Sequence, residues 1–575
     1  MHDIVIRGGK IVDGSGADAF AGDVALQGDR IVQVGGKAGP GKREIDADGA
    51  LVTPGFVDIH THYDGQVTWD PYLTPSSWHG VTSLVMGNCG VGFAPARPDR
   101  HDWLIGRMEG VEDIPGSALA EGIDWTWESF PDYLDALDVK PLALDVGTQV
   151  PHGAVRAYVM GERGARNQPA TPDDIAAMAD IVEQGLRAGA LGFSSSRTML
   201  HRAVDGEPVP GTFAGHDELM GIGRACGRAG HGVFEISSDL GIMGTESRFK
   251  DDVIWMRDLS RETGLPVSFI LTQDQRWPDE WRNVAGWASE AVADGARLML
   301  QTGSKPPGLL MGLGSTMHPF QGHPTYMEIA DLPLTERARR LSDPAVKARL
   351  LAEESTLKSA FNRHVFNHFA GMFPLGDPPD YEPGPDQSVA ALADKAGRDP
   401  RAFLLDTMLG RDGTELVYYP LQNYAYGDFS AVYEMLNHPL SLLSLSDGGA
   451  HCGLICDASA PTFVLTHWVR DRQRGPRLRL ETAVRKQTSA TASAYGLNDR
   501  GLLKPGYRAD VNVIDFDGLR LHAPERVADL PAGGQRLVQR GDGYLATIVA
   551  GTQTYANGEA TGALPGKLVR GPQAV

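Results

Sequence analysis

Residues 54–62 read Pro54-Gly55-Phe56-Val57-Asp58-Ile59-His60-Thr61-His62, an apolar run that follows a Pro-Gly turn and ends in two histidines. Such a run is typical of a buried strand. Because alternate residues of a strand point the same way, His60 and His62 are expected to project together. Two imidazoles at that spacing suit a divalent metal ion. The alternative is a pair of polar side chains that are satisfied inside the fold.

Further apolar runs follow this one and alternate with helical stretches. At one predicted helix start, Thr171 precedes Pro172 and Asp174, the order expected of an N-cap, a first-turn proline and an early acid. Strands that alternate with helices indicate parallel strands with crossover helices, so the sequence predicts an α/β fold, a (β/α)8 TIM-like barrel. The active site of such a barrel lies at the carboxyl ends of its strands. The eight predicted strands are residues 56–62, 81–86, 143–148, 191–195, 232–237, 267–272, 298–302 and 442–446.

The two ends of the chain have a different pattern, with short β runs separated by turns. Residues 1–54 and 483–575 are each too short for a comfortable core, so we expect them to meet and complete one small composite β-sandwich. The barrel is then expected over residues 55–482. It contains a long insertion, about residues 303–440, between the seventh and eighth strands. Connections of this length are usually functional.

Two other strand ends carry groups that bind metal ions. The second strand runs into Gly87-Asn88-Cys89-Gly90, where a metal ion would make Cys89 a thiolate; the alternative is a buried structural thiol. The eighth strand ends in Ser446-Asp447-Gly448, so a carboxylate emerges at the same rim. Asp447 is expected to ligate the metal ion and to hold the proton of a reacting water, with a turn-capping role as the alternative.

The composition limits the partners of the protein. The 575 residues include 53 Lys+Arg against 73 Asp+Glu, and the formal net charge of −20 argues against nucleic acid as a partner. No window reaches 18 uninterrupted apolar residues, and an acid stands where a signal peptide carries basic residues, so we expect a cytoplasmic protein without membrane contact. The cysteines are too few for a disulfide framework. The sequence leaves a homo-oligomer open.

The chain resembles the amidohydrolase superfamily, and specifically its N-acyl-D-amino-acid deacylase (D-aminoacylase) branch. The His-x-His after Pro-Gly-Phe-Val-Asp and the closing Gly-x-x-x-Pro-Gly-x-x-Ala-Asp point to the superfamily, and Gly-Asn-Cys-Gly narrows it to the branch. The resemblance implies a metal-dependent hydrolase with a composite β-sandwich, and it implies metal roles for His60, His62, Cys89 and Asp447. The segments that carry it are residues 7–16, 54–64, 79–83, 87–90, 189–195, 446–448 and 500–510.

The sequence departs from this branch at the fifth and sixth strands. Members of the branch carry a histidine at each of these strand ends, but here the matching residues are Glu235 and Leu271. Glu235 is expected either to bind the metal as a carboxylate, which zinc accepts, or only to orient water. Without the two histidines we predict one Zn²⁺ ion rather than two. Members of the branch carry a lysine after strand six, and the matching residue here is Gln273. The chain therefore lacks a cation that would pair with a substrate carboxylate.

Three further residues near the rim are predicted to bind substrate. Ser195 and Arg197 belong to the end of the fourth strand, and His451 lies four residues beyond Asp447. Arg197 would contact an anionic or carbonyl group, with a structural salt bridge as the alternative. His451 would aid proton transfer, with a structural role as the alternative.

The preferred hypothesis is hydrolysis of a C–N bond in a small amide substrate by a metal-activated water, as in an N-acyl-amino-acid deacylase. Asp447 would accept the water proton and return it to the leaving nitrogen. A second hypothesis is hydrolysis of a cyclic amide, imide or carbamate, for which only the pocket would differ. A third, from another class, is a non-catalytic binding protein on a decayed amidohydrolase scaffold, which the two missing histidines suggest.

Overall fold

Eight parallel strands form the central sheet of the protein. The structure is a computed structural model, and it describes residues 1–240 and 246–575. The strands follow one another around the sheet in chain order, and each is parallel to its neighbours. A strand lies at each of the eight predicted places, but the first ends at Asp58, before His60 and His62, and the last ends at Leu443. They are β6 (Phe56–Asp58), β7 (Val81–Met86), β8 (Asp145–Pro151), β9 (Gly192–Arg197), β10 (Val233–Ser238), β11 (Val267–Ile270), β12 (Leu298–Thr302) and β16 (Ser441–Leu443).

The first and last strands are joined just beyond their carboxyl ends. His62 N donates a hydrogen bond to Gly448 O at 2.8 Å, and Asp447 N donates to His60 O at 3.2 Å. A parallel bridge between Thr61 and Gly448 belongs to the same seam. The sheet therefore closes into the TIM-type barrel that the sequence predicts, and the seam consists of segments that carry predicted metal ligands.

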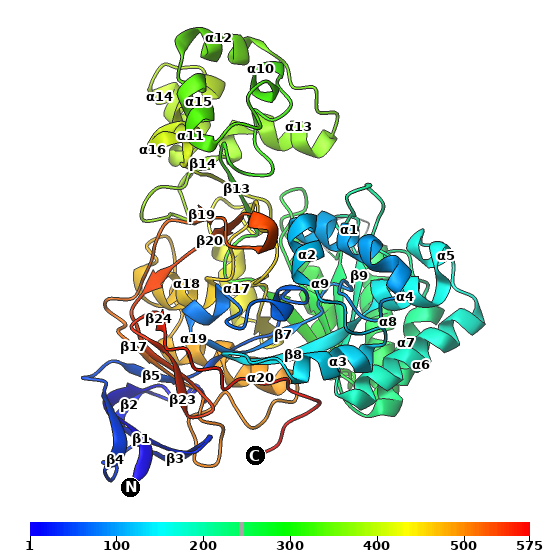
Figure 1. Cartoon of the computed structure of the whole chain (residues 1–575), viewed down its shortest axis with the longest axis vertical. Helices are drawn as coiled ribbons and strands as arrows, with labels where there is room; N and C mark the ends of the chain where they lie inside the picture. Colours follow the sequence, from blue (N-terminus) through cyan, green and yellow to red (C-terminus); the bar gives the residue numbers. More distant parts are fainter. Residues whose placement is uncertain (241–245) are drawn as a thin grey trace.

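Helices cover the outside of the barrel (Figure 1). The predicted start of α6 is confirmed, because the Thr171 hydroxyl accepts a hydrogen bond from Asp174 N in a capping box. The crossover from β6 to β7 differs from the expected strand-helix unit: it contains 3-10 turns at Gln66–Thr68 and Ser76–His79. In residues 1–240 and 246–575, no helix combines the length and apolar character needed to span a membrane. The barrel helices include α4 (His152–Met160), α6 (Pro172–Ala188), α7 (His216–Ala229), α8 (Glu246–Thr263), α9 (Glu280–Ala293), α17 (Ser430–Asn437), α19 (Leu480–Gln487) and α20 (Ser489–Ala494).

Large apolar side chains fill the layer between strands and helices. The buried rings of Phe193 on β9 and Phe234 on β10 lie 5.0 Å apart, centroid to centroid. His152 of α4 packs on Phe193 at 5.2 Å, and Trp255 of α8 packs on Phe234 at 6.4 Å. Burying such rings is strongly favourable, so the strand faces that carry them point outward and leave the alternate residues for the barrel interior.

Strands from both ends of the chain share a second sheet. It contains nine strands, in which β5 pairs with β1 on one side and with β17 on the other. The shared sheet agrees with the expectation that the two ends meet. Its strands are β1 (His2–Ile11), β2 (Phe20–Gln27), β3 (Arg30–Val34), β4 (Gly41–Asp46), β5 (Leu51–Pro54), β17 (Val511–Ile514), β22 (Tyr544–Val549), β23 (Thr552–Ala556) and β24 (Glu559–Ala560).

The predicted insertion between the seventh and eighth strands contains a lobe with its own apolar core. Leu341, Met372, Leu404 and Val417 are fully buried in this core. Figure 1 shows the helices of the lobe gathered beyond the barrel, at the top of the view. Its elements are β13 (Gly308–Met311), α10 (Pro324–Met327), α11 (Leu334–Leu341), α12 (Pro344–Ala352), α13 (Ala360–Asn367), β14 (Phe373–Pro374), α14 (Val389–Lys395), α15 (Pro400–Met408), α16 (Gly410–Gly413) and β15 (Val417–Pro420).

A second excursion, between β7 and β8, reaches the mouth of the barrel. It contains α1 (His101–Glu112), α2 (Gly116–Gly122) and α3 (Phe130–Asp138). The end of α1 is bound to the segment that follows β16: His451 N donates to Glu112 O, and Gly453 N donates to the Asp113 carboxylate at 2.9 Å. This contact brings the last residue of α1 close to the seam of the barrel.

The insertion is tied to the barrel by Glu382, which is 3% exposed. Its carboxylate accepts hydrogen bonds from Arg472 Nη2 and His467 Nε2, both at 2.9 Å, and from Phe429 N at 2.8 Å. Burial opposes the charged form, but the hydrogen bonds from His467 and Arg472 outweigh it and lower the pKa of Glu382 to about 2.

Replacing Glu382 with glutamine is expected to lower the free energy of unfolding by about 3 kcal/mol at pH 7, because Arg472 is then left buried without its charge partner. A lowered folded-state pKa contributes stability above the ordinary value of 4.5 and loses it as the pH falls toward 2. The difference between wild type and variant should therefore shrink from pH 6 to about pH 3 in urea titrations. The control is Glu336→Gln, which changes a partly exposed glutamate paired with the exposed Arg339 and Arg340 and is expected to change stability by less than about 0.5 kcal/mol. Equal effects of the two substitutions would contradict this account.

Candidate metal centre

His60 and His62 follow β6 at the carboxyl end of the barrel, and both are 1% exposed. His60 Nδ1 lies 2.7 Å from Gln301 Oε1 on β12. Gln301 donates through its amide nitrogen to Ser268 Oγ at 3.0 Å, and its oxygen, which also accepts from Ser444 Oγ at 2.9 Å, has a second lone pair for the Nδ1 proton of His60. His60 Nε2 then carries the lone pair, which is the form of imidazole that binds a cation.

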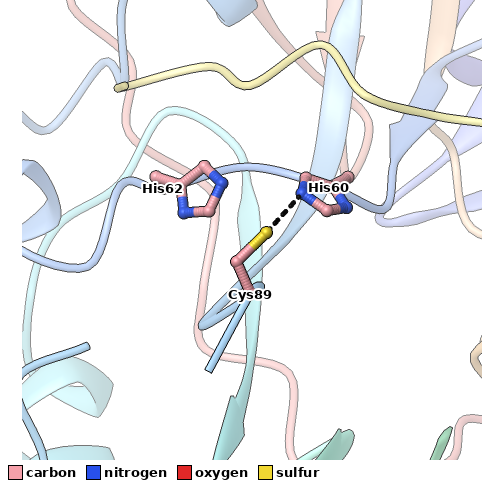
Figure 2. Close-up of side chains that lie close together, drawn as sticks. All are labelled: His60, His62 and Cys89. Atoms are coloured by element: carbon pink, nitrogen blue, oxygen red, sulfur yellow. Dashed lines mark hydrogen bonds between the residues drawn. The ribbon is translucent and has the colours of Figure 1, made fainter. Parts of the chain in front are cut away.

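Cys89 brings a thiol against these imidazoles. Its Sγ lies 3.3 Å from His60 Nε2 (Figure 2), and the ligand atoms of His60, His62 and Cys89 all lie within 4.8 Å of one another. The thiol keeps its proton and bonds to His60 Nε2, because burial and the charge of Glu235 raise the pKa of Cys89 well above its usual range. A cation would take the place of that proton.

Asp447 adds a carboxylate close to both rings. Its Oδ1 lies 3.5 Å from His60 Nε2 and 3.7 Å from His62 Nε2. Burial disfavours the carboxylate, but the nearby His62, together with the charges of His60 and His451, holds the pKa of Asp447 well below its usual range. Burial likewise opposes protonation of His62, but Glu112 and Asp447 raise the pKa of His62 to about 9.

The backbone is strained where two of these residues sit. Cys89 has φ 57° and Asp447 has φ 46°, both in the left-handed region that non-glycine residues avoid. Such conformations persist where the surroundings impose them, and they cluster at functional sites. The strain therefore favours a functional role for both residues over a structural thiol and a turn cap.

Glu235 lies beside the cluster, where its carboxylate contacts the backbone of Cys89 rather than the thiol. Its Oε2 accepts a hydrogen bond from Cys89 N at 3.0 Å, whereas its buried Oε1 has no hydrogen-bond partner among the described residues. Burial raises the pKa of Glu235 to about 8. Leu271, at the position of the second missing histidine, is fully buried and apolar.

Gln273 serves the insertion rather than the metal cluster. Its Oε1 accepts a hydrogen bond from Ala425 N at 3.0 Å, and its backbone N donates to Asn423 Oδ1 at 2.7 Å. Gln273, which stands where the branch has a lysine, therefore holds the segment before α17 in place.

The donor set fits a divalent metal ion. Two imidazole nitrogens and a thiolate are ligands that zinc accepts, and neighbouring ligands around a tetrahedral zinc ion lie about 3.5 Å apart. The contacts of His60 Nε2 with Cys89 Sγ and Asp447 Oδ1, at 3.3 and 3.5 Å, match that spacing. Glu235 Oε1, buried without a partner among the described residues, offers a further oxygen at the edge of the cluster.

The three predicted substrate contacts lie in different places. Ser195 is behind the strand, where its hydroxyl bonds to His152 Nδ1 of α4 at 2.8 Å, so the structure does not bring it to the cluster. Arg197 donates to Ala214 O at 2.6 Å and lies 3.7 Å from the Asp252 carboxylate, which favours the structural alternative. His451 does lie at the cluster, with its side chain 24% exposed.

Two residues near the cluster were not found by the sequence reasoning. Glu112 contacts His62 and His451 from the end of α1. His201 lies beyond β9, where its Nδ1 is 3.0 Å from Ser196 Oγ. Burial, followed by the charges of His451 and His62, lowers the pKa of His201 to about 3. Neither residue belongs to a recognisable motif, and both become visible only when the barrel is assembled.

A TIM-type barrel whose strand ends gather imidazoles, a thiol and a carboxylate is typical of metal-dependent hydrolases. Residues 43–555 match the amidohydrolase family, so the chain belongs to that family. This confirms the resemblance stated from the motifs.

Known relatives cover nearly the whole chain. D-aminoacylase of Alcaligenes xylosoxydans xylosoxydans is 27% identical over 571 residues, which span 99% of this chain and 97% of that protein. A solved structure of D-aminoacylase, described with a binuclear metal centre, is similar with a TM-score of 0.65 at 23% identity, covering 99% of this chain and 100% of that chain. N-acyl-D-glutamate deacylase of Bordetella bronchiseptica, solved with zinc and a phosphonate inhibitor, is similar with a TM-score of 0.63 at 22% identity and covers 99% of each chain. The two structures show that the fold is shared.

Proposed function

We propose that the protein is a zinc-dependent hydrolase of amide-like C–N bonds, most similar in activity to the N-acyl-D-amino-acid deacylases. The observation that carries the proposal is the buried cluster of His60, His62 and Cys89, whose ligand atoms lie within 4.8 Å of one another beside Asp447. The family and the relatives named as deacylases support the reaction class. The composite β-sandwich, a single zinc ion and metal ligation by Glu235 are parts of the same proposal.

The residues of the site have different roles in the proposed reaction. When bound, zinc would lower the pKa of a water molecule and polarise the carbonyl oxygen of the substrate. His60, His62 and Cys89 would hold the ion, and Gln301 fixes the ring of His60. Asp447, whose pKa is held low, is ionised at neutral pH and can accept the proton of the attacking water. The water oxygen bonds to the carbonyl carbon, the C–N bond breaks, and Asp447 gives the proton to the leaving nitrogen, so the products are a carboxylic acid and an amine.

The test is a panel of N-acyl amino acids, with both enantiomers of each, assayed with and without added zinc. We expect activity that a chelator removes and zinc restores, with one zinc ion per chain. His60→Ala should lose both the bound zinc and at least about 10³-fold in kcat/KM. A matched control is His216→Ala, which changes an exposed histidine at the start of α7 and should leave zinc content unchanged. A wild-type protein that takes up no zinc would favour the binding-protein hypothesis.

The environment of Gln273 favours a second candidate within the same chemistry. Because this residue supplies no cation and is bonded to residues 423 and 425, a substrate without a free carboxylate suits the site. Cyclic amides, imides and carbamates are such substrates. If ring substrates are hydrolysed and linear N-acyl amino acids are not, this candidate replaces the deacylase.

A further inference from the structure

The carboxylate of Glu112 is buried between two histidines at the mouth of the barrel. Its Oε1 lies 3.4 Å from His62 Nδ1, and its Oε2 lies 3.6 Å from His451 Nε2. The side chain of Glu112 is only 2% exposed. The backbone holds the same contact, because His451 N donates a hydrogen bond to Glu112 O. Glu112 is therefore fixed against the cluster from a helix that lies outside the barrel.

The facing atoms of Glu112 and His62 have no competing partner. Within residues 1–240 and 246–575, neither His62 Nδ1 nor Glu112 Oε1 makes a hydrogen bond. A buried polar atom without a partner costs free energy, so such atoms mark positions with a function beyond packing. Asp64, another buried acid whose charge acts on His62, already accepts a hydrogen bond from Gly87 N at 3.2 Å. Glu112 Oε1, 3.4 Å from Nδ1 and without another partner among the described residues, is the acceptor that faces Nδ1.

We infer that Glu112 is a positioning residue of the metal centre, which accepts the Nδ1 proton of His62 so that Nε2 faces the cation, and which orients His451 with its other oxygen. The inference rests on the proposed zinc site. When Nε2 of a histidine binds a cation, the ring proton is on Nδ1, and a carboxylate that accepts this proton fixes the ring and makes Nε2 more basic. For His60 the equivalent acceptor is the neutral amide of Gln301.

Through Glu112, the excursion between β7 and β8 has a role in the site. His60, His62, Cys89 and Asp447 all belong to strand ends, whereas Glu112 comes from α1. Because its two oxygens face a predicted ligand and a half-buried histidine near the surface, movement of α1 would change both contacts at once. Zinc binding is expected to depend on the position of this helix.

The test measures zinc affinity of the full chain by competition with a chromophoric chelator. Glu112→Gln keeps the size of the side chain and removes its charge, and it should weaken zinc binding about 10- to 100-fold. Glu112→Asp keeps the charge but shortens the reach, so its zinc affinity should fall between that of Glu112→Gln and that of wild type. Cobalt substituted for zinc gives a second readout, because a reoriented His62 changes the ligand field and shifts the visible absorption bands.

The control is Glu109→Gln, which changes a residue on the same helix whose carboxylate accepts a hydrogen bond from Gly116 N. This variant should bind zinc as wild type does. The thermal stability of the metal-free proteins separates positioning from folding: the Glu112 variants should lose zinc affinity without a matching loss of metal-free stability. If wild type binds zinc and both Glu112 variants bind it equally well, the inference is overturned, whereas the proposed function stands. If wild type binds no zinc, the proposed function itself fails.

Discussion

The Asp447→Asn variant is expected to retain zinc and to lose about 10³-fold in kcat, the effect of removing a positioned general base. Asparagine has the size of aspartate but cannot take up a proton at neutral pH. The Oδ1 atom of Asp447 faces both His60 and His62, so an uncharged amide would still fill the site. Steady-state kinetics and metal analysis of the same samples would measure the two effects separately.

The control for this prediction is Asp99→Asn, which changes an aspartate whose side chain is 77% exposed. It should leave both kcat and zinc content unchanged. If Asp447→Asn instead loses zinc, the carboxylate serves mainly as a ligand. If it retains full activity, another group moves the proton, and His451 or His201 would be the next residue to replace.

A comparably large effect on stability is expected at Asp145, the first residue of β8. This carboxylate is fully buried and accepts hydrogen bonds from Arg500 at 2.7 Å, from Arg508 at 2.8 Å and from Lys567 N at 3.0 Å. Asp145→Asn would remove the countercharge that two buried guanidinium groups share and leave Asp499 and Asp510 as their acids, so the free energy of unfolding should fall by about 3 kcal/mol. Urea titration monitored by circular dichroism would measure the change.

The matched control is Asp18→Asn, because Asp18 also pairs with an arginine from the far end of the chain, Arg479, but is 90% exposed. Its replacement should cost less than about 0.5 kcal/mol. Asp145 lies at the amino end of its strand, away from the site, so the folded Asp145→Asn protein should keep its zinc. Similar losses of stability in the two variants would show that the Asp145 cluster is not a strong link between the barrel and the C-terminal segment.

The sequence predicts the barrel and most of the metal cluster because both depend on local patterns. Apolar runs mark each strand, and barrel geometry brings their carboxyl ends together, so His60, His62, Cys89 and Asp447 could be grouped without coordinates. The family match then confirms the class of enzyme.

What the sequence does not predict depends on register and long-range packing. Three consecutive serines end β9, and only its pairing with β10 decides that Ser194 shares a side with Glu235 while Ser195 faces α4. Glu112 is the last residue of α1, and the sequence pattern of this helix does not indicate where the Glu112 side chain points. Its approach to His62 depends on how α1 contacts the segment after β16, which no local signal encodes.

The closure of the barrel has a consequence for its dynamics. Within residues 1–240 and 246–575, the regions of the first and last strands are joined by few hydrogen bonds. The backbones of His62 and Asp447 donate to Gly448 O and His60 O, and the Ser446 hydroxyl donates to His60 O and to the Asp58 carboxylate. An ion held by His60 would also attract the Asp447 carboxylate, whose Oδ1 lies 3.5 Å from His60 Nε2, and would so link these two regions, which lie at opposite ends of the barrel sequence. Amide hydrogen exchange at His62 and Asp447 should therefore slow on zinc uptake far more than exchange in β9 or β10. The metal would then suppress opening of the barrel at its junction as well as take part in the reaction.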